Sequence, residues 1–268
     1  MWTVNGAGAG SLDIPGSFVF SAMESLVGGT SADQFLFGDG ASLTGALTDK
    51  GQGALDYSAR SAAFSVNLAT GAATAIAGGV SGIGSFIGTG QVDTFIGPAV
   101  DSQWLIDGSN QGTVAGRQFS SFENLTGGVA EDVFVLGAGG SVSGIIDGAG
   151  GLDTLQASGS AADDSVTIAV GVLNIAGRQT LYANIDVLEV DTAGGADTVG
   201  ITTDGLPEYI VLRTGLGNDR IRFQVSTGST TSIDINAGGG TDSVTVQGTA
   251  DADDIDLDGL LLWINKPC

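Results

Sequence analysis

Short segments in which apolar and polar residues alternate follow one another along the whole chain. Clear examples are "VTIAVGVLNIAG" from Val166, "SIDINAG" from Ser232 and "DSVTVQG" from Asp242. These segments are rich in β-branched residues, alternate with a period of two and end at Gly or Asn, which is typical of β-strands and not of helices. The pattern predicts an all-β fold.

A glycine-rich turn, an aspartate and an apolar residue two positions later recur along the chain. The copies are "GGTSADQF" (28–35), "GTGQVDTF" (88–95), "GGVAEDVF" (127–134), "GAGGLDTL" (148–155), "TAGGADTV" (192–199), "TGLGNDRI" (214–221), "AGGGTDSV" (237–244) and the weaker "GQGALDYS" (51–58). Their spacing corresponds to one or two units of about 19–23 residues, and a period of this size indicates a stack of repeated coils. We therefore predict a single right-handed parallel β-helix, or β-solenoid, with Val, Ile, Leu and Phe inside.

This period places particular residues above one another. Asp197, Asp219 and Asp242 lie 22 and 23 residues apart and should form one column on consecutive coils. Phe35, Phe95 and Phe134 occupy one motif position, and we expect them to stack in the interior.

Longer repeats lie on top of the short ones. "WTVNGAGAGSL" at Trp2 matches "WLIDGSNQGTV" at Trp104, and the segment from Met23 matches the segment from Phe122. We thus expect one continuous solenoid over 1–268, with a first module type over 1–158, about 100 residues per repeat and a second copy from 102. A second type over 159–268 repeats after about 90 residues, because "DDSVTI" at Asp163 recurs as "DDIDLD" at Asp253. Both ends of the chain are expected to fall inside a module.

Composition narrows the possible functions. The 268 residues contain 46 glycines and carry a formal net charge of −22, so phosphate backbones and anionic lipid surfaces are repelled. Histidine is absent, which excludes Ser-His-Asp triads and imidazole zinc sites. The single cysteine, Cys268, permits no disulfide within the chain but could cross-link two chains. No apolar stretch approaches a membrane span, and the first residues do not have the pattern of a secretory signal.

The repeated motif resembles the calcium-binding nonapeptides of repeats-in-toxin (RTX) proteins, whose pattern is GGxGxDxUx with U a large apolar residue. "TGLGNDRIR" from Thr214 matches this pattern at Gly215, Gly217, Asp219 and Ile221. The longer modules are similar to those of very large bacterial surface or secreted adhesins and haemagglutinins. The resemblance implies a β-solenoid and Ca²⁺ held between turns, although here the motif recurs only once in about 22 residues.

The aspartates therefore have two interpretations. They are candidate Ca²⁺ ligands, since Ca²⁺ takes six to eight oxygens from carboxylates and carbonyls. The alternative is that each aspartate closes its turn by accepting backbone N–H bonds while glycine supplies the positive φ. The candidate metal ligands are Asp197, Asp219, Asp242, Asp33, Asp56, Asp132 and Asp153. Calcium is expected first in the column of Asp197, Asp219 and Asp242, although Arg220 or Arg222 could neutralise Asp219 instead.

Other functions are weighed against this scheme. The glycine loops lead into strands and not helices, so they do not suit a phosphate. The Thr-rich segments do not recur coil after coil, as an ice-binding face requires. A β-helix carbohydrate-active enzyme, such as a polysaccharide lyase or glycosidase, is the main alternative, with candidates in Asp163 with Asp164, Asp253 with Asp254, or Asp219 beside the arginines.

Because a catalytic site is normally a singular departure from a repeat, we expect a structural and adhesive protein, not an enzyme. The chain is then a segment of a larger extracellular or cell-surface bacterial protein. Its expected partners are neighbouring segments or like chains end to end, and surface glycans or proteins, but neither nucleic acid nor membrane interior.

Overall fold

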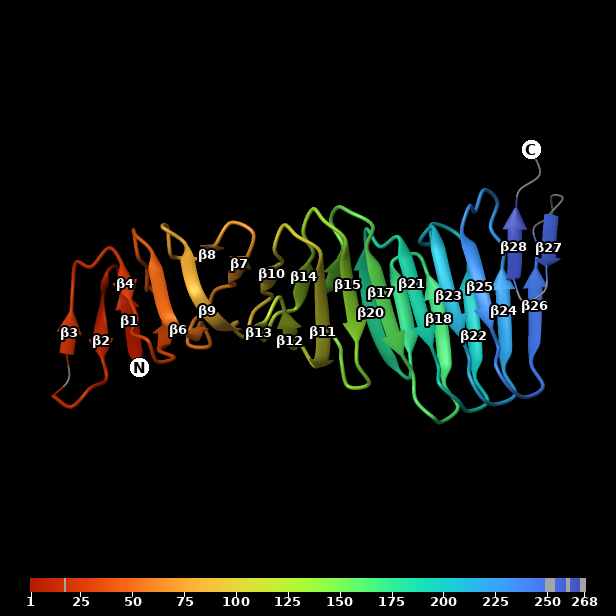
Figure 1. Cartoon of the computed structure of the whole chain (residues 1–268), viewed down its shortest axis with the longest axis horizontal. Coiled ribbons are helices and arrows are strands. Elements are labelled where there is room, and N and C mark those ends of the chain that lie inside the picture. The colour runs from red at the N-terminus through yellow and green to blue at the C-terminus, as the bar shows by residue number, and fades with distance from the viewer. Residues whose placement is uncertain (17, 249–253, 259–260, 266–268) are drawn as a thin grey trace.

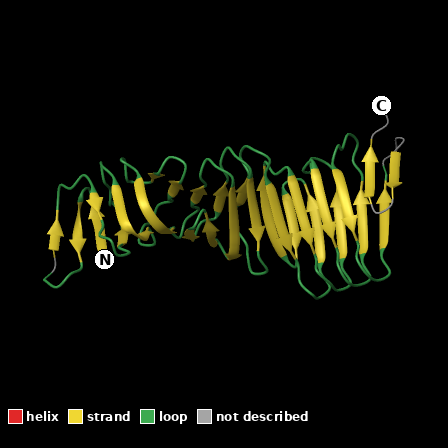
Figure 2. Ribbon diagram, in the orientation of Figure 1, coloured by secondary structure: helices red, strands yellow, loops and turns green. Residues whose placement is uncertain are grey.

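The computed structural model describes residues 1–16, 18–248, 254–258 and 261–265, of which the last two segments are described by backbone only. Within these residues the chain is all-β without a helix, and it forms an elongated body along which the strands follow one another (Figures 1 and 2). The strands belong to two sheets. No helix in the described part of the chain is long and apolar enough to cross a membrane.

The first sheet has 17 described strands: β1 (Trp2–Gly6), β2 (Ala9–Leu12), β3 (Phe18–Phe20), β4 (Leu26–Val27), β5 (Gln34–Phe37), β6 (Leu47–Asp56), β9 (Val80–Ile87), β11 (Ser102–Gly108), β12 (Gln111–Val114), β13 (Arg117–Ser120), β15 (Asp132–Leu136), β17 (Thr154–Ser158), β21 (Val187–Asp191), β23 (Tyr209–Arg213), β25 (Ser232–Asn236), β27 (Asp254–Asp258) and β28 (Leu261–Asn265). The second sheet has 11: β7 (Ser65–Asn67), β8 (Ala72–Ala73), β10 (Thr94–Ile96), β14 (Asn124–Thr126), β16 (Ile145–Asp147), β18 (Ser165–Ala169), β19 (Val172–Ile175), β20 (Arg178–Ala183), β22 (Thr198–Thr202), β24 (Arg220–Gln224) and β26 (Ser243–Gln247).

In its second half the chain alternates between the two sheets. β21, β23 and β25 pair in parallel in the first sheet, while β22, β24 and β26 pair in parallel in the second. Leu188 is opposite Ile210, and Ile210 is opposite Ile233, so these coils contain 22 and 23 residues. The parallel pairing and the repeat length expected from the sequence are confirmed for this region.

Elsewhere the prediction of uniform parallel coils is wrong. β1–β2–β3, β11–β12–β13 and β18–β19–β20 are antiparallel three-stranded meanders inserted into the stack. Ser165 is therefore opposite Thr198, a step of 33 residues. The turns Ala115–Gly116 and Ala176–Gly177 have positive φ at both positions, as a two-residue type I′ hairpin requires. The period-two pattern did not reveal this, because parallel and antiparallel strands share it.

The meanders begin in the same way in the two Trp-containing repeats. Trp2 in β1 is opposite Phe35 in β5, and Trp104 in β11 is opposite Phe134 in β15. The rings of each pair are stacked, with centroids 5.9 and 5.2 Å apart. Each of these two meanders also has a register shift in its pairing of the first two strands, between Val4 and Gly6 and between Ile106 and Gly108.

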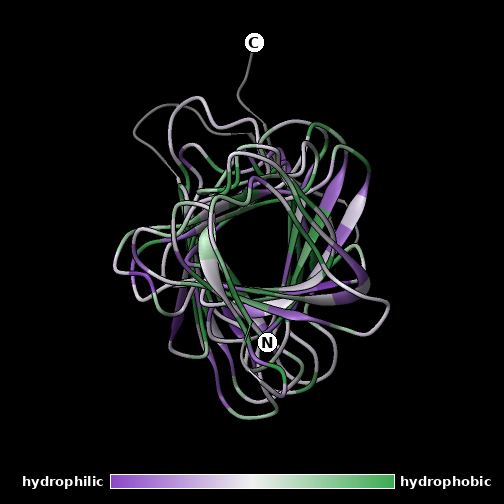
Figure 3. Cartoon of the chain, turned by 90° about the vertical axis from the view of Figure 1, so that its left-hand side faces the viewer, coloured by the Kyte–Doolittle hydropathy of each residue, from purple (hydrophilic) through white to green (hydrophobic). Residues whose placement is uncertain are grey.

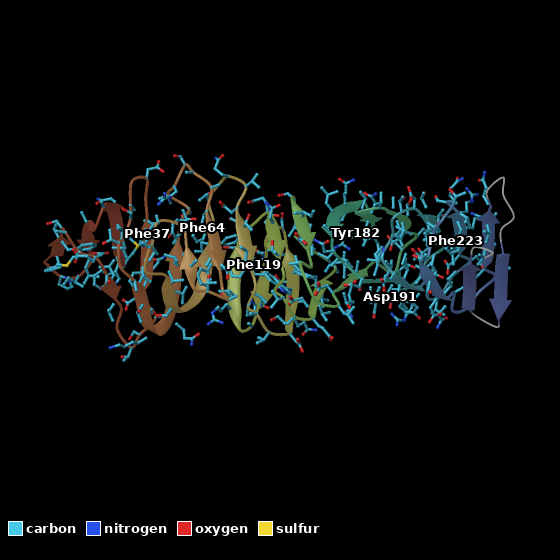
Figure 4. All side chains as sticks on the ribbon, turned by 90° about the horizontal axis from the view of Figure 1, so that it is seen from above. Phe37, Phe64, Phe119, Tyr182, Asp191 and Phe223 are labelled. Atoms are coloured by element: carbon cyan, nitrogen blue, oxygen red, sulfur yellow. The ribbon has the colours of Figure 1, made fainter. Side chains whose placement is uncertain are left out.

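Apolar side chains fill the space between the sheets along the length of the molecule. Phe35, Phe95 and Phe134 are fully buried, so the expectation that this motif position is internal is confirmed. Phe95 packs against Phe122 and Trp104 with edge-to-face geometry, which favours aromatic contact. The strands overlie one another around one long axis (Figure 3), and the labelled Phe37, Phe64, Phe119 and Phe223 mark successive levels of the core (Figure 4).

Candidate functional site: the aspartate ladders

The motif aspartates of the second half lie directly before the strands of the second sheet. Asp197, Asp219 and Asp242 precede β22, β24 and β26, whose first residues are opposite one another. The three therefore form the column predicted from their spacing. Asp164, before β18, extends it by one level, because Ser165 is opposite Thr198.

Each carboxylate after Asp164 in this column accepts a hydrogen bond from the backbone of the preceding aspartate. The backbone N–H of Asp164 donates to Oδ1 of Asp197 (2.8 Å), and that of Asp197 donates to Oδ1 of Asp219 (2.9 Å). The backbone N–H of Asp219 donates to Oδ1 of Asp242 (3.0 Å). These four residues form what we call the first aspartate ladder. Its side chains thus join consecutive coils at the turn that precedes each strand, beside backbone bonds such as that from Arg220 N–H to the carbonyl of Asp197.

A second aspartate ladder stands before strands of the first sheet. It consists of Asp132, Asp153 and Asp186, at the starts of β15, β17 and β21. The backbone N–H of Asp132 donates to Oδ1 of Asp153, and that of Asp153 donates to Oδ2 of Asp186, both at 2.8 Å. The same hydrogen-bond pattern thus occurs on both sides of the molecule.

The remaining candidates are placed differently. Asp33 precedes β5 and its Oδ2 accepts from the backbone N–H of Gly29, but Asp56 does not stand above it. Gln34 is opposite Ala54, so the neighbour of Asp33 in β6 is Gly53, and Asp56 lies three residues further along that strand. Asp93 accepts from the backbone N–H groups of Phe64 and Thr89. Asp56 is therefore not equivalent to the other motif aspartates.

The second carboxylate oxygen of several ladder aspartates accepts from a Ser or Thr four or five residues earlier. The backbone N–H of Ser160 donates to Oδ2 of Asp164 (2.7 Å), and the Thr192 hydroxyl donates to Oδ2 of Asp197. The sequence analysis did not identify this partner, nor Asp164 and Asp186 as ladder members. The sequence does contain a signal for the Ser or Thr partner. The segments "SAADD" and "TAGGAD" each place a hydroxyl residue at the start of the turn that ends in the aspartate.

Burial raises the pKa of several of these carboxyl groups. The pKa of Asp153 is raised to about 6, first by desolvation and then by the negative charges of Asp132 and Asp186. The pKa values of Asp132 and Asp197 are raised by the same dominant cause, although hydrogen bonds from Gly128 and Thr192 lower them in part. Ionising these carboxyl groups at neutral pH therefore carries a cost that their hydrogen bonds offset only in part.

Two buried carboxylate oxygens in the ladders accept no hydrogen bond within standard geometry: Oδ1 of Asp132 and Oδ2 of Asp219. The indole of Trp104 lies beside Asp132 and lowers its pKa, although the indole N–H and Oδ1 of Asp132 do not meet full hydrogen-bond geometry. Near Asp219 the Thr214 hydroxyl is oriented toward the carbonyl of Ala237 (3.3 Å). Thr214 therefore does not give Asp219 the contact that Thr192 gives Asp197.

The geometry fits an acceptor role better than a calcium cage. No group of three or more carboxylate, Cys or His ligands converges within the described residues. The glycine-turn carbonyls expected to face an ion are partly used, since Gly215 O accepts from the backbone N–H of Gly239 (2.8 Å). Arg220 and Arg222 form no ion pair with Asp219 among the described residues, because Asp219 is buried and both arginines are exposed.

The candidate catalytic pairs are also engaged in turns. Asp163 accepts from the backbone N–H of Ala196 (2.7 Å), while Asp164 belongs to the first ladder. Asp253 and Cys268 lie outside the described residues, as does the side chain of Asp254.

Comparison with protein-family models and with curated proteins finds no match to the chain.

Proposed function

We propose that the chain is one continuous right-handed β-solenoid and a structural, adhesive segment of a larger repetitive bacterial protein at the cell surface or outside the cell. Within it, 1–158 and 159–268 are two module types of one body. The observation that supports this most strongly is the repeated hydrogen bonding of the aspartates, which joins each coil to the next. The motif residues thus serve the stacking of coils, as a rigid spacer requires.

The ladders also favour a non-catalytic role. A catalytic carboxylate must face a substrate, whereas Asp153, Asp197 and Asp219 are at most 1% exposed. Their carboxylates accept hydrogen bonds from the backbone of the preceding coil, in a pattern that repeats on both sheets. Neighbouring segments of the same protein, or like chains end to end, are the partners that such a stack suits. Val244 in β26, the last described strand of the second sheet, is 47% exposed at that edge.

Shape in solution tests the solenoid. β4 and β5 both pair with β6 and share one level, so the 17 described strands of the first sheet form 16 levels. At a spacing of about 4.8 Å these levels give a rod about 70 Å long. We expect small-angle scattering to give a radius of gyration clearly above the roughly 18 Å of a compact domain of this length. A value near 18 Å, with a bell-shaped distance distribution, would contradict a single rod.

Location tests the second part of the proposal. Antibodies raised against the chain should label intact, unpermeabilised cells of the source organism, or detect the parent protein in the culture medium. Labelling that requires cell lysis would contradict a surface or extracellular role. An antibody against a cytoplasmic enzyme is the control for cell integrity.

Calcium stabilisation is part of the proposal at the first ladder, where Oδ2 of Asp219 is buried without a partner. An ion bound there would contact Asp219 first and reach Asp197 or Asp242 on the adjoining coils. Since a ligand that binds only the folded state stabilises it, calcium should raise the melting temperature relative to excess chelator. Magnesium is the control, and Asp219→Asn should remove the difference. Superimposable curves would leave the ladder with its hydrogen-bonding role alone.

A further inference from the structure

The two faces of the molecule differ in charge where the coils are most regular. On the outside of β21, β23 and β25 in the first sheet lie Glu189, Asp191 and Asp234, with Arg213 paired to Glu189 at 3.4 Å. The outward positions of β18, β22, β24 and β26 in the second sheet hold no carboxylate: Ser165, Thr167, Ala169, Thr198, Gly200, Thr202, Arg220, Arg222, Gln224, Ser243, Thr245 and Gln247. We call these twelve residues the arginine face.

The arginine face concentrates two of the eight basic residues of a chain that has 30 acidic ones. Arg220 and Arg222 point to the same side of β24, about 6.6 Å apart along the strand. Both are exposed, and neither has a salt bridge within the part of the chain that the structure describes. Among the residues that the structure describes, the exposed carboxylates that flank the face lie in turns, at Asp163 before β18 and Asp204 after β22.

The neighbours of the arginines leave their guanidinium groups accessible. Arg222 lies between Gly200 on one side and Thr245 on the other, while Arg220 lies between Thr198 and Ser243. A Cβ at Gly200 would meet only the carbonyl oxygen of Val166, at 4.0 Å, so neither space nor a positive φ requires glycine there. The face is therefore a flat array of hydroxyl and amide groups around two uncovered guanidinium forks.

We propose, resting on the adhesive function above, that the arginine face binds a carboxylated polysaccharide. Arg pairs bidentately with carboxylates, and the surrounding Thr, Ser and Gln side chains hydrogen-bond to sugar hydroxyls. A polymer with one carboxylate and several hydroxyls on each sugar unit matches a face with two cations among neutral donors. At physiological salt the charges on the opposite face are screened beyond about 8 Å, so the overall negative charge does not prevent local binding.

Other partners fit the face less well. Protein interfaces are anchored by aromatic and large apolar residues, and the arginine face contains neither. Single-stranded nucleic acid needs aromatic stacking platforms, and duplex DNA is commonly held by about 6–10 phosphate contacts. Two arginines satisfy neither requirement.

Binding of the full chain to polygalacturonate, measured by biolayer interferometry, tests the proposal. Neutral dextran, dextran sulfate and single-stranded DNA serve as comparison polymers. We expect the double variant Arg220→Ser/Arg222→Ser to weaken polygalacturonate binding at least ~10-fold, because charge-assisted bonds are the strong ones. The matched control, Arg117→Ser/Arg213→Ser, changes the net charge equally, from −22 to −24, at sites off the face and should change binding less than ~2-fold.

A second pair of variants addresses the face without removing an arginine. Gly200→Glu places a carboxylate beside Arg222 and should weaken binding, whereas Gly200→Gln fills the same space without charge and should weaken binding less. Circular dichroism and scattering confirm that each variant keeps the rod, so loss of glycan binding remains distinguishable from failure of the solenoid.

Three results would overturn the proposal. The first is an equal loss of polygalacturonate binding in Arg220→Ser/Arg222→Ser and in Arg117→Ser/Arg213→Ser, or no loss in either. The second is binding of the full chain to neutral dextran as tight as its binding to polygalacturonate, or tighter binding to single-stranded DNA than to polygalacturonate. The third is self-association of the wild type that disappears in Arg220→Ser/Arg222→Ser without a change in glycan binding, which would make the face a contact between copies.

Discussion

Each aspartate of the first ladder after Asp164 stabilises the stack through one carboxylate oxygen, which accepts a backbone N–H of the preceding coil. Asp219 Oδ1 accepts the backbone N–H of Asp197, an aspartate that is 0% exposed. Asp219→Ala should destabilise the protein by about 1–3 kcal/mol, because it leaves that buried donor without a partner. Asp219→Asn keeps an acceptor oxygen and should cost less than half as much. Urea denaturation measures both, and equal losses for the two variants would contradict the acceptor role.

The buried ladder carboxyls also predict how stability depends on pH. Asp153 has a folded pKa of about 6, above its ordinary value of 3.8, so between these values the folded state binds more protons than the unfolded state. Its contribution to stability is therefore lost as pH rises through about 6. We expect a higher melting temperature at pH 5 than at pH 7.

Asp153→Asn provides the control for this pH dependence. The amide retains an oxygen for the backbone N–H of Asp132 and removes the buried charge. The variant should flatten the pH profile between 5 and 7. A wild type that is less stable at pH 5 than at pH 7 would show that other groups dominate.

At the scale of the element, close approach between turns decides where glycine is required. Gly217 has φ +146°, and a Cβ there would lie 1.6 Å from the carbonyl oxygen of Gly195 on the neighbouring coil. Gly217→Ala should therefore destabilise the protein by more than ~1 kcal/mol. Gly200→Ala in β22 is the matched control, because its position is open, and it should be neutral or slightly stabilising. Equal denaturation midpoints for the two variants would contradict this account of the turn.

For the whole molecule, a stack of coils predicts local consequences of core damage. Phe95 is fully buried against Phe86, Trp104, Phe119 and Phe122, and Phe95→Ala should cost about 3–5 kcal/mol. Because each coil contacts only its neighbours, hydrogen exchange should accelerate around β9 to β15 while β23 and β25 change little. Uniform acceleration would indicate one cooperative unit. Phe18→Ala, at a side chain 52% exposed, is the control.

The sequence by itself determined the strands, the interior position of Phe95 and the stacking of Asp197, Asp219 and Asp242. Each of these follows from a local period, either the alternation of two or the repeat near 22, and a period needs no knowledge of distant residues. The glycine turns were likewise recognisable from composition and spacing.

The tertiary structure decided the meanders, the displacement of Asp56 and the partners of the carboxylates. Alternation is the same in parallel and antiparallel strands, so only the φ values at Ala176–Gly177 and the pairing of β18, β19 and β20 distinguish them. Whether a carboxylate meets an ion or an N–H depends on the coil placed beside it. Asp219 lies within reach of the backbone of Asp197 because β22 and β24 pair in register, and that contact joins residues far apart in the chain.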